Sequence, residues 1–271
     1  MALSVNTNVM SLNSQRNLSN STNDLSTSYQ RLSSGLRVNS AADDAAGLQI
    51  GSRLESQMKG LDQAARNAND GISIAQTAEG ALEETTTMMQ RMRVLAIQSA
   101  NGSNSADDRA ALQKEFAQLN EEITRVADTT TFGGVNVLDG TYSADFQVGA
   151  DASQTIAVSI SVAMDATGLS TGGLDISTAS GAQAAIDGLD DSLKAVNDVR
   201  ADLGAKQNRF SSTIRNLTNV SENVAASRSR IMDADFAAES ASLARNQVLQ
   251  QASSSMLAQA NQQPQIALSL L

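Results

Sequence analysis

Apolar residues recur at every seventh position in the C-terminal half of the chain. This row consists of Leu189, Val196, Leu203, Phe210, Leu217, Val224 and Ile231. A seven-residue period kept over this many turns indicates a coiled coil, because it holds one apolar stripe along the side of a helix. We therefore expect a single helix over residues 182–230, roughly 70 Å long at about 1.5 Å per residue.

An upstream row has the same period and predicts a partner helix. It consists of Leu54, Leu61, Ala68, Ala75, Leu82, Met89 and Ala96. A shorter third helix is expected after Ser105 and Asp108, which have the spacing of a capping box. Its apolar stripe would be Leu112, Phe116, Leu119, Ile123 and Val126. We expect a mostly α, elongated antiparallel bundle whose core includes Leu54, Leu61, Leu82, Leu203, Phe210, Leu217 and Val224.

Between residues 129 and 182 the pattern changes from helical to alternating. The alternating apolar residues are Ile156, Val158, Ile160 and Val162. Such alternation is typical of a half-buried strand. Breaks are expected at Gly133-Gly134 and at Asp139-Gly140, the second as a hairpin turn. The sequence therefore predicts a small β insert at about residues 130–180. Its Asp and Gly clusters do not fit a twelve-residue EF-hand loop, so solvated turns are favoured over a Ca²⁺ site.

Both terminal segments carry amphipathic patterns. Their apolar residues are Leu18, Leu25, Tyr29, Leu32 and Leu36 near one end, and Phe236, Leu243, Leu249, Met256 and Leu257 near the other. Neither segment is apolar enough to be buried alone, and a pair of such helices would still expose an apolar stripe. An exposed stripe favours binding to copies of the same chain. We expect paired terminal helices that act in self-assembly.

The stretch "SSGLRVNSAADDAAGLQI" (residues 33–50) interrupts the helical pattern. A second interruption lies near residue 233. Because the two breaks are placed symmetrically about the centre, we expect them to form two strands of one connector between the bundle and the terminal pair. The connector residues would be Gly35, Arg37, Asn39, Asp43, Asp44 and Gly47.

Composition argues against most enzyme chemistry. The chain has no His, no Cys and no Trp. Serine, cysteine and histidine triads and His/Cys metal sites are therefore excluded, although isolated carboxylates remain available for acid–base chemistry. The excess of 29 acidic over 19 basic residues argues against nucleic acid and anionic membranes. No apolar run reaches membrane-spanning length, and no cleaved secretory signal is expected. We expect no catalytic residues, cofactor or metal.

The segments described above closely resemble bacterial flagellin. The N-terminal matches are "VNTNVMSLNSQRNL", "LSTSYQRLSSGLRVNSAADDAAGLQI", "QAARNANDGISIAQTAEGAL" and "MQRMRVLAIQSANG". The C-terminal match is "RIMDADFAAESASLARNQVLQQASSSMLAQANQQPQIALSLL". The resemblance implies an inner-core domain of residues 1–42 with 232–271, and a next domain of residues 43–231. The 33–47 connector would be the spoke between them, and the large outer domains of many flagellins are missing.

The resemblance also implies function and partners. Flagellins are exported unfolded by a type III-related flagellar apparatus and self-assemble into the extracellular filament that drives swimming. The implied partners are further copies of the chain, the export apparatus, an export chaperone that binds around residues 243–257, and the filament cap and hook–filament junction proteins. No nucleic acid or membrane partner is implied.

Two more features are carried over from the family. The surface recognised by the host Toll-like receptor for flagellin would include Arg91, Leu95 and Glu115, although Val94 replaces the family's frequent Glu. A solvated or inter-subunit face is the alternative for these residues. The candidate O-glycosylation sites are Ser143, Thr155, Ser159 and Ser161.

Three other identities are alternatives. A hook–filament junction protein shares terminal helices of this kind, but "DDAAGLQI", "FGGVNVLDG" and "QPQIALSLL" favour flagellin. An enzyme with an inserted metallopeptidase domain would need histidines that the chain lacks. A monomeric coiled-coil adaptor would leave the terminal stripes unexplained.

Overall fold

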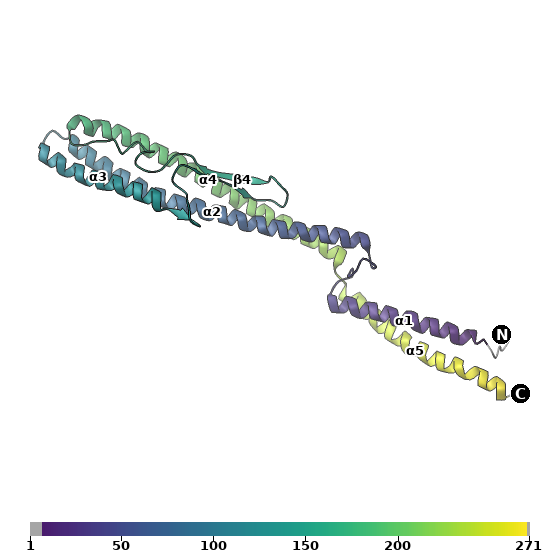
Figure 1. Ribbon diagram of the computed structural model, residues 1–271. Coiled ribbons are helices and arrows are strands. Elements are labelled where there is room, and N and C mark those ends of the chain that lie inside the picture. Colours follow the sequence, from purple (N-terminus) through teal and green to yellow (C-terminus); the bar gives the residue numbers. More distant parts are fainter. Residues whose placement is uncertain (1–6, 270–271) are drawn as a thin grey trace. The chain divides into compact units, whose positions relative to one another are not determined.

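The computed structural model describes residues 7–269, and the side chains of residues 7–263. Contacts divide the chain into two compact units, Met1–Ser56 with Asn223–Leu271 and Gln57–Glu222. The helices are α1 (Val9–Ser34), α2 (Ala45–Ala100), α3 (Ala106–Thr129), α4 (Ala179–Met232) and α5 (Phe236–Ser269). The bounds of α2 and α4 cross the divisions after Ser56 and Glu222, so both helices contribute to both units. Figure 1 shows α1 beside α5, and α2, α3 and α4 in the bundle. The predicted helical bundle with a small β insert is confirmed.

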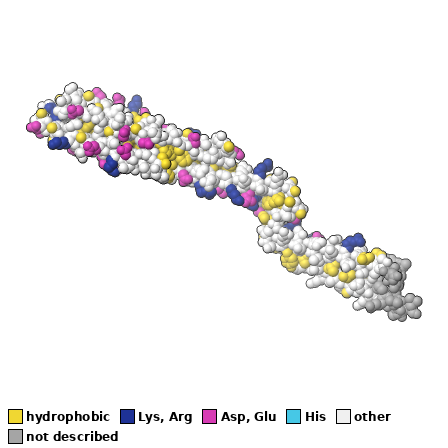
Figure 2. All heavy atoms as spheres, in the orientation of Figure 1, with side chains coloured by type: hydrophobic (Ala, Val, Ile, Leu, Met, Phe, Trp, Pro, Cys, Tyr) yellow, Lys and Arg dark blue, Asp and Glu magenta, His cyan; other side chains and the backbone are white. Residues whose placement is uncertain are grey.

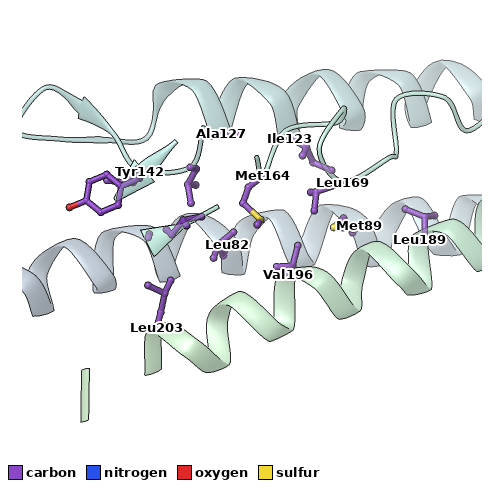
Figure 3. Packing of buried hydrophobic residues seen from close by; sticks show 14 of the residues in the cluster. Leu82, Met89, Ile123, Ala127, Tyr142, Met164, Leu169, Leu189, Val196 and Leu203 are labelled. Carbon is purple, nitrogen blue, oxygen red and sulfur yellow. The ribbon is translucent and has the colours of Figure 1, made fainter. Parts of the chain in front are cut away.

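Within the 57–222 unit, α2 and α4 run antiparallel. Arg93 pairs with Asp190, Gln207 donates to Glu79, and Ser221 donates to Asp62, so partners on α4 descend as residues on α2 ascend. The interface between the two helices is built from the heptad rows. One buried cluster contains Ala68, Ala75, Leu82, Met89, Ala96, Leu189, Val196, Leu203 and Phe210. Figure 3 shows Leu82, Met89 and Val196 within this packing.

The third helix packs against the same cluster through one face. Phe116, Ile123 and Ala127 are its buried residues. The predicted capping box is confirmed: the Asp108 N–H donates to Ser105 Oγ at 3.2 Å, and the Ser105 N–H donates to the Asp108 carboxylate at 2.9 Å. These bonds satisfy backbone groups that the first helical turn leaves without partners, and so fix where α3 begins.

The β insert consists of two antiparallel pairs. β1 (Thr131–Phe132) pairs with β2 (Val135–Asn136) around Gly133 and Gly134, both at positive φ. β3 (Tyr142–Gln147) pairs with β4 (Thr155–Ile160). Alternate residues of β4 face the helices, since Ile156, Val158 and Ile160 are buried while the residues between them are exposed. Val162 is 40% exposed and lies beyond the strand.

The hairpin predicted at Asp139-Gly140 is wrong. β2 and β3 do not pair, and the connection between the paired strands β3 and β4 is residues 148–154. Asp139 instead forms an isolated bridge with Ala163, and Gly140 adopts φ 81°. A Cβ at position 140 would lie 2.5 Å from the Ala163 nitrogen, so the Asp-Gly pair serves a close backbone approach rather than a two-residue turn.

A small second cluster continues the bundle beyond Phe210. It contains Leu61, Ala64 and Leu217, with Ala65 and Val220 packed beside them. Leu54 and Val224, which were expected in the bundle core, are half-buried and belong to the other unit. Apolar packing between α2 and α4 is therefore most extensive along the main cluster, which reaches Ala68 on α2 and Phe210 on α4. The packing is weaker beyond these residues, toward Ser56 and Asn223.

Candidate self-assembly surface of the terminal helices

The helices α1 and α5 pack on each other through small side chains. Ser21 and Ser28 are the buried residues of α1, and they stand seven residues apart. On α5, Ala260 is buried and Ser253, seven residues earlier, is half-buried. The predicted apolar residues Leu18, Leu25, Leu32 and Leu243 are only half-buried. Small residues bring the two helices close together and leave the leucines at the margins of the contact.

Polar contacts between described residues also join the pair. Asn8 Nδ2 donates to the Ala260 carbonyl at 2.7 Å, and Ser11 Oγ donates to Asn261 Oδ1 at 2.7 Å. At the other end, Gln247 donates to the Tyr29 hydroxyl at 3.1 Å, and Arg31 lies 3.7 Å from Glu239. Hydrogen bonds and ion pairs that are exposed or only partly buried contribute little net stability, but these contacts fix the register of the two helices.

Large apolar side chains remain exposed on both helices. They are Val9, Met10, Leu12 and Tyr29 on α1, and Phe236, Val248, Leu249 and Met256 on α5. Charged residues are few: α1 carries Arg16, Asp24 and Arg31, and α5 carries Glu239 and Arg245. Figure 2 shows apolar side chains on this pair with little charge between them on the face in view. Such a surface suits contact with protein.

A groove of about 410 Å³ lies between the two helices near the chain ends. It is lined by Met10, Asn13, Ser14, Asn17, Met256, Gln259, Ala260 and Gln263. The two methionines supply flexible apolar walls, and the amides supply hydrogen-bonding groups. The groove therefore offers space for side chains from another molecule.

The connector is formed by short backbone contacts within the same unit. Gly35 ends α1 at φ 72°, with its N–H donating to the Arg31 carbonyl at 2.8 Å. Its own carbonyl accepts from the Ala234 N–H at 2.9 Å, and the Arg37 N–H donates to the Met232 carbonyl at 2.7 Å. Leu36 and Asp233 form an isolated antiparallel bridge. The two breaks in the sequence thus lie side by side, as their symmetric placement in the sequence indicated.

Two neighbouring aspartates order the loop that leads into α2. The Asp43 carboxylate accepts from the N–H groups of Asn39 and Ser40 and from the Ser40 hydroxyl. These bonds, chiefly the one from the Ser40 N–H, hold the pKa of Asp43 below its usual value. Asp44 accepts from the Gly47 N–H at 2.8 Å, and a Cβ on Gly47 would lie 2.4 Å from that carboxylate.

Two connector residues escaped the sequence analysis. Val38 is 1% exposed and Met232 is 6% exposed, so they form the apolar centre of the connector. Gly51 packs directly on the methionine, because a Cβ there would lie 2.5 Å from its sulfur. Neither Val38 nor Met232 belongs to a heptad row, and only the pairing of the two chain breaks brings them together.

The three candidate receptor residues have different environments. Arg91 and Glu115 are exposed and form an ion pair at 2.7 Å between α2 and α3. Leu95 is 1% exposed and belongs to the main core cluster. The Leu95 side chain faces the bundle interior, so the exposed part of this candidate surface is the Arg91–Glu115 pair. The exposed apolar residues of this helix segment are Val94 and Ile97 instead.

The candidate glycosylation residues all lie at the surface. Ser143, Thr155, Ser159 and Ser161 are exposed, and Ser143 lies opposite Ser159 in the β3–β4 register. Exposure is necessary for modification but does not distinguish modified residues from plain ones.

Among the described residues, no group of three or more acidic side chains is arranged to hold a metal ion. Helices within the same part of the chain are not apolar enough over a sufficient length to cross a membrane.

Comparison with known proteins assigns the chain to a family. The sequence model of the family for the bacterial flagellin N-terminal helical region matches residues 5–143. The family model for the bacterial flagellin C-terminal helical region matches residues 186–271. A flagellin of Halalkalibacterium halodurans is 48% identical over 269 residues, covering 98% of this chain and 99% of that protein. Flagellin B of Vibrio cholerae is 40% identical over 375 aligned positions, covering all of both chains.

Solved structures agree with this assignment. The crystal structure of Bacillus cereus flagellin is 35% identical, covers 60% of this chain and 94% of its own, and superposes with a TM-score of 0.51. A putative flagellar hook-associated protein from Vibrio parahaemolyticus shares the fold at 14% identity, with a TM-score of 0.59, covering 70% of this chain and all of its own. The chain belongs to the bacterial flagellins, the structural subunits of the flagellar filament, and is not an enzyme.

Proposed function

We propose that α1 and α5 are the segments through which copies of this chain assemble, and that they become fully ordered only within the filament. The observation that carries the proposal is the packing of the pair. Among the described side chains, its buried positions are Ser21, Ser28 and Ala260, and the large apolar side chains of the same residues, 9–34 and 236–263, stay partly or mostly exposed.

Energetics support coupled folding and assembly. Ordering the backbone of one residue costs about 1–2 kcal/mol. Full burial of a large aliphatic side chain contributes about 1.5–3 kcal/mol. Leu18, Leu25 and Leu32 of α1 are half-buried and receive only part of that contribution. Neighbouring subunits would supply the rest by covering the exposed residues and filling the groove near Met10 and Met256.

Head-to-tail contacts of this kind, repeated on every copy, build an open helical filament rather than a closed ring. On this proposal the chain travels unfolded through the flagellar type III apparatus, and the absence of cysteine leaves no disulfide to obstruct threading. An export chaperone would cover α5 around residues 243–257 before assembly. The finished filament lies outside the cell and contacts the cap and the hook–filament junction proteins.

Seeded polymerisation of purified monomer tests the proposal. Full-length chain should elongate filament seeds, scored by sedimentation and negative-stain electron microscopy. Chains lacking residues 1–32 or 240–271 should fail to elongate seeds while keeping the helical circular dichroism of the 57–222 unit. Elongation by either truncated chain would refute a requirement for both terminal helices.

Point variants separate assembly from folding. Val248→Glu and Met256→Glu place charges at side chains that are 65% and 59% exposed, so the monomer should fold normally while elongation is lost. Val162→Glu, at a 40% exposed residue beyond β4, is the matched control and should elongate normally. Equal loss in all three variants would point to a general effect of added charge.

Recognition by the host Toll-like receptor is a second proposed function, resting on the exposed Arg91–Glu115 pair. Arg91→Ala should weaken activation of receptor-expressing reporter cells, because it removes the charge that the pair presents between two helices. Arg66→Ala, another exposed arginine on α2, is the control. If both variants activate the receptor equally, Arg91 is not part of the recognised surface.

A further inference from the structure

Residues 101–105 connect α2 to α3 and contain the one Asn-Gly sequence in the chain, Asn101-Gly102. Both residues are exposed, and no atom lies within 4 Å of a Cβ built on Gly102. Asparagine followed by glycine is the pair in which the next backbone nitrogen most easily reaches the side-chain carbonyl carbon, because glycine has no side chain to obstruct it. The turn therefore offers a site for intramolecular chemistry.

We propose that Asn101 is a self-modification site of the folded protein, which deamidates through a cyclic imide with Arg109 as a positioning residue. The Gly102 nitrogen attacks Asn101 Cγ and loses its proton to solvent. The bond from Cγ to Nδ2 then breaks, and ammonia leaves with a proton from water. Water opens the imide at either carbonyl, giving aspartate or isoaspartate, so the net change is addition of water and loss of ammonia.

One hydrogen bond restrains the side chain of Asn101. The Ser103 N–H donates to Asn101 Oδ1 at 3.3 Å, which ties the side-chain amide to the backbone of the same turn. The same N–H faces the oxygen on which negative charge develops as the ring closes. A donor aimed at a developing oxyanion lowers the barrier of such a step.

A second contact acts on the nucleophile. Arg109 Nη2 donates to the Asn101 backbone carbonyl at 3.0 Å, and its Nε donates to the Ser99 carbonyl at 2.9 Å. The Asn101 carbonyl and the Gly102 nitrogen belong to one peptide group, so a cation on that oxygen stabilises the anion formed when the nitrogen loses its proton.

The Gly102 N–H itself has no hydrogen-bond partner among the backbone contacts of residues 7–269. Inside helices the situation differs, since each peptide nitrogen is held by the carbonyl four residues earlier. The Asp-Gly pairs at Asp70 and Asp187 lie within α2 and α4, in the helical bundle. Both the sequence and the structure therefore favour cyclic imide formation in the turn after α2.

The experiment is ageing of the full-length monomer in mildly alkaline buffer, followed by peptide mapping with mass spectrometry. Isoaspartate is detected with protein isoaspartyl methyltransferase and a radiolabelled methyl donor. Asn101 should convert about tenfold faster than the Asn-Ser pairs at Asn13, Asn20, Asn39 and Asn104, a barrier difference of about 1.4 kcal/mol. If Asn101 converts no faster than those pairs, the proposal that Asn101 is a self-modification site is overturned.

Two variants test the mechanism. Gly102→Ala fits the open space without a clash and should slow conversion about tenfold; an unchanged rate would overturn ring closure through that nitrogen. Arg109→Gln should slow conversion in the folded chain and leave it unchanged in urea. A turn that is merely loosened would react faster, so an equal or faster folded rate in Arg109→Gln would overturn the positioning role.

Discussion

Gly71 and Phe210 meet where α2 and α4 pack most tightly. A Cβ on Gly71 would lie 2.7 Å from the Cζ atom of Phe210. The ring cannot swing aside freely, because Phe210 is fully buried and stands edge-on to Phe146, with ring centroids 5.7 Å apart and an interplanar angle of 88°. We therefore predict that Gly71→Ala destabilises the bundle, although alanine is the better helix former.

The magnitude follows from two opposing effects. Overpacking of a tight core costs about 1–3 kcal/mol, and replacing a helical glycine with alanine stabilises by about 0.5–1 kcal/mol. Gly80 lies in the same helix with no atom within 4 Å of a Cβ, so Gly80→Ala should show the stabilising effect alone. The difference between the two variants isolates the steric cost, about 1–3 kcal/mol.

A double-mutant cycle identifies the clashing partner. Phe210→Leu loses the ring contact with Phe146, worth about 0.5–1.5 kcal/mol, but it should relieve the clash with the methyl group introduced at position 71. The two changes should therefore be less harmful together than their sum, with a coupling of about 0.5–3 kcal/mol.

The assay is urea unfolding of each monomeric variant, followed by circular dichroism, with midpoints compared at unchanged slopes. Equal midpoint shifts for Gly71→Ala and Gly80→Ala would refute the reasoning, and so would simple additivity with Phe210→Leu.

Three further predictions concern the same unit. Leu203→Ala should cost close to the upper end of about 2–5 kcal/mol and Leu217→Ala close to the lower end, because Leu203 lies in the main cluster and Leu217 in the small one; equal urea midpoints would contradict this. Ser105→Ala should destabilise α3 by about 1 kcal/mol, seen as faster amide exchange in its first turn, and unchanged exchange would exclude the cap. The hydrogen bond from Arg93 holds the pKa of Asp190 below its usual 3.8. The ion pair therefore stabilises the folded protein at pH values above 3.8, and this contribution is lost as the pH falls through the lowered pKa of Asp190. Asp190→Asn should flatten acid unfolding over that range, and an unchanged profile would count against the linkage.

The helices could be read from the sequence because their packing is periodic. Leu189, Val196 and Leu203 keep one face of α4 apolar, and the structure buries all three. The start of α3 was also predictable, since the capping box of Ser105 and Asp108 is a local arrangement that needs no distant partner.

Features that depend on distant partners were not predictable. Asp139-Gly140 has the composition of a hairpin turn, but the contact with Ala163 gives it another role. The apolar centre of the connector joins Val38 with Met232, nearly two hundred positions away in the chain. The resemblance places Leu95 among the receptor contacts, whereas its side chain is buried in the main cluster of the bundle.

The α2–α4 pair and the α1–α5 pair place different side chains at a seven-residue spacing, and this difference explains why the first pair forms an apolar core while the second leaves large apolar side chains exposed. In the bundle, the residues seven apart on α4 are Val196, Leu203 and Phe210, which are fully buried. On α1, the residues seven apart that face α5 are Ser21 and Ser28. A serine seam holds the helices in register but buries little apolar area. Leu18, Leu25 and Leu32 beside it stay half-buried. On the proposed mode of assembly, the apolar area that would complete the packing comes from another copy of the chain.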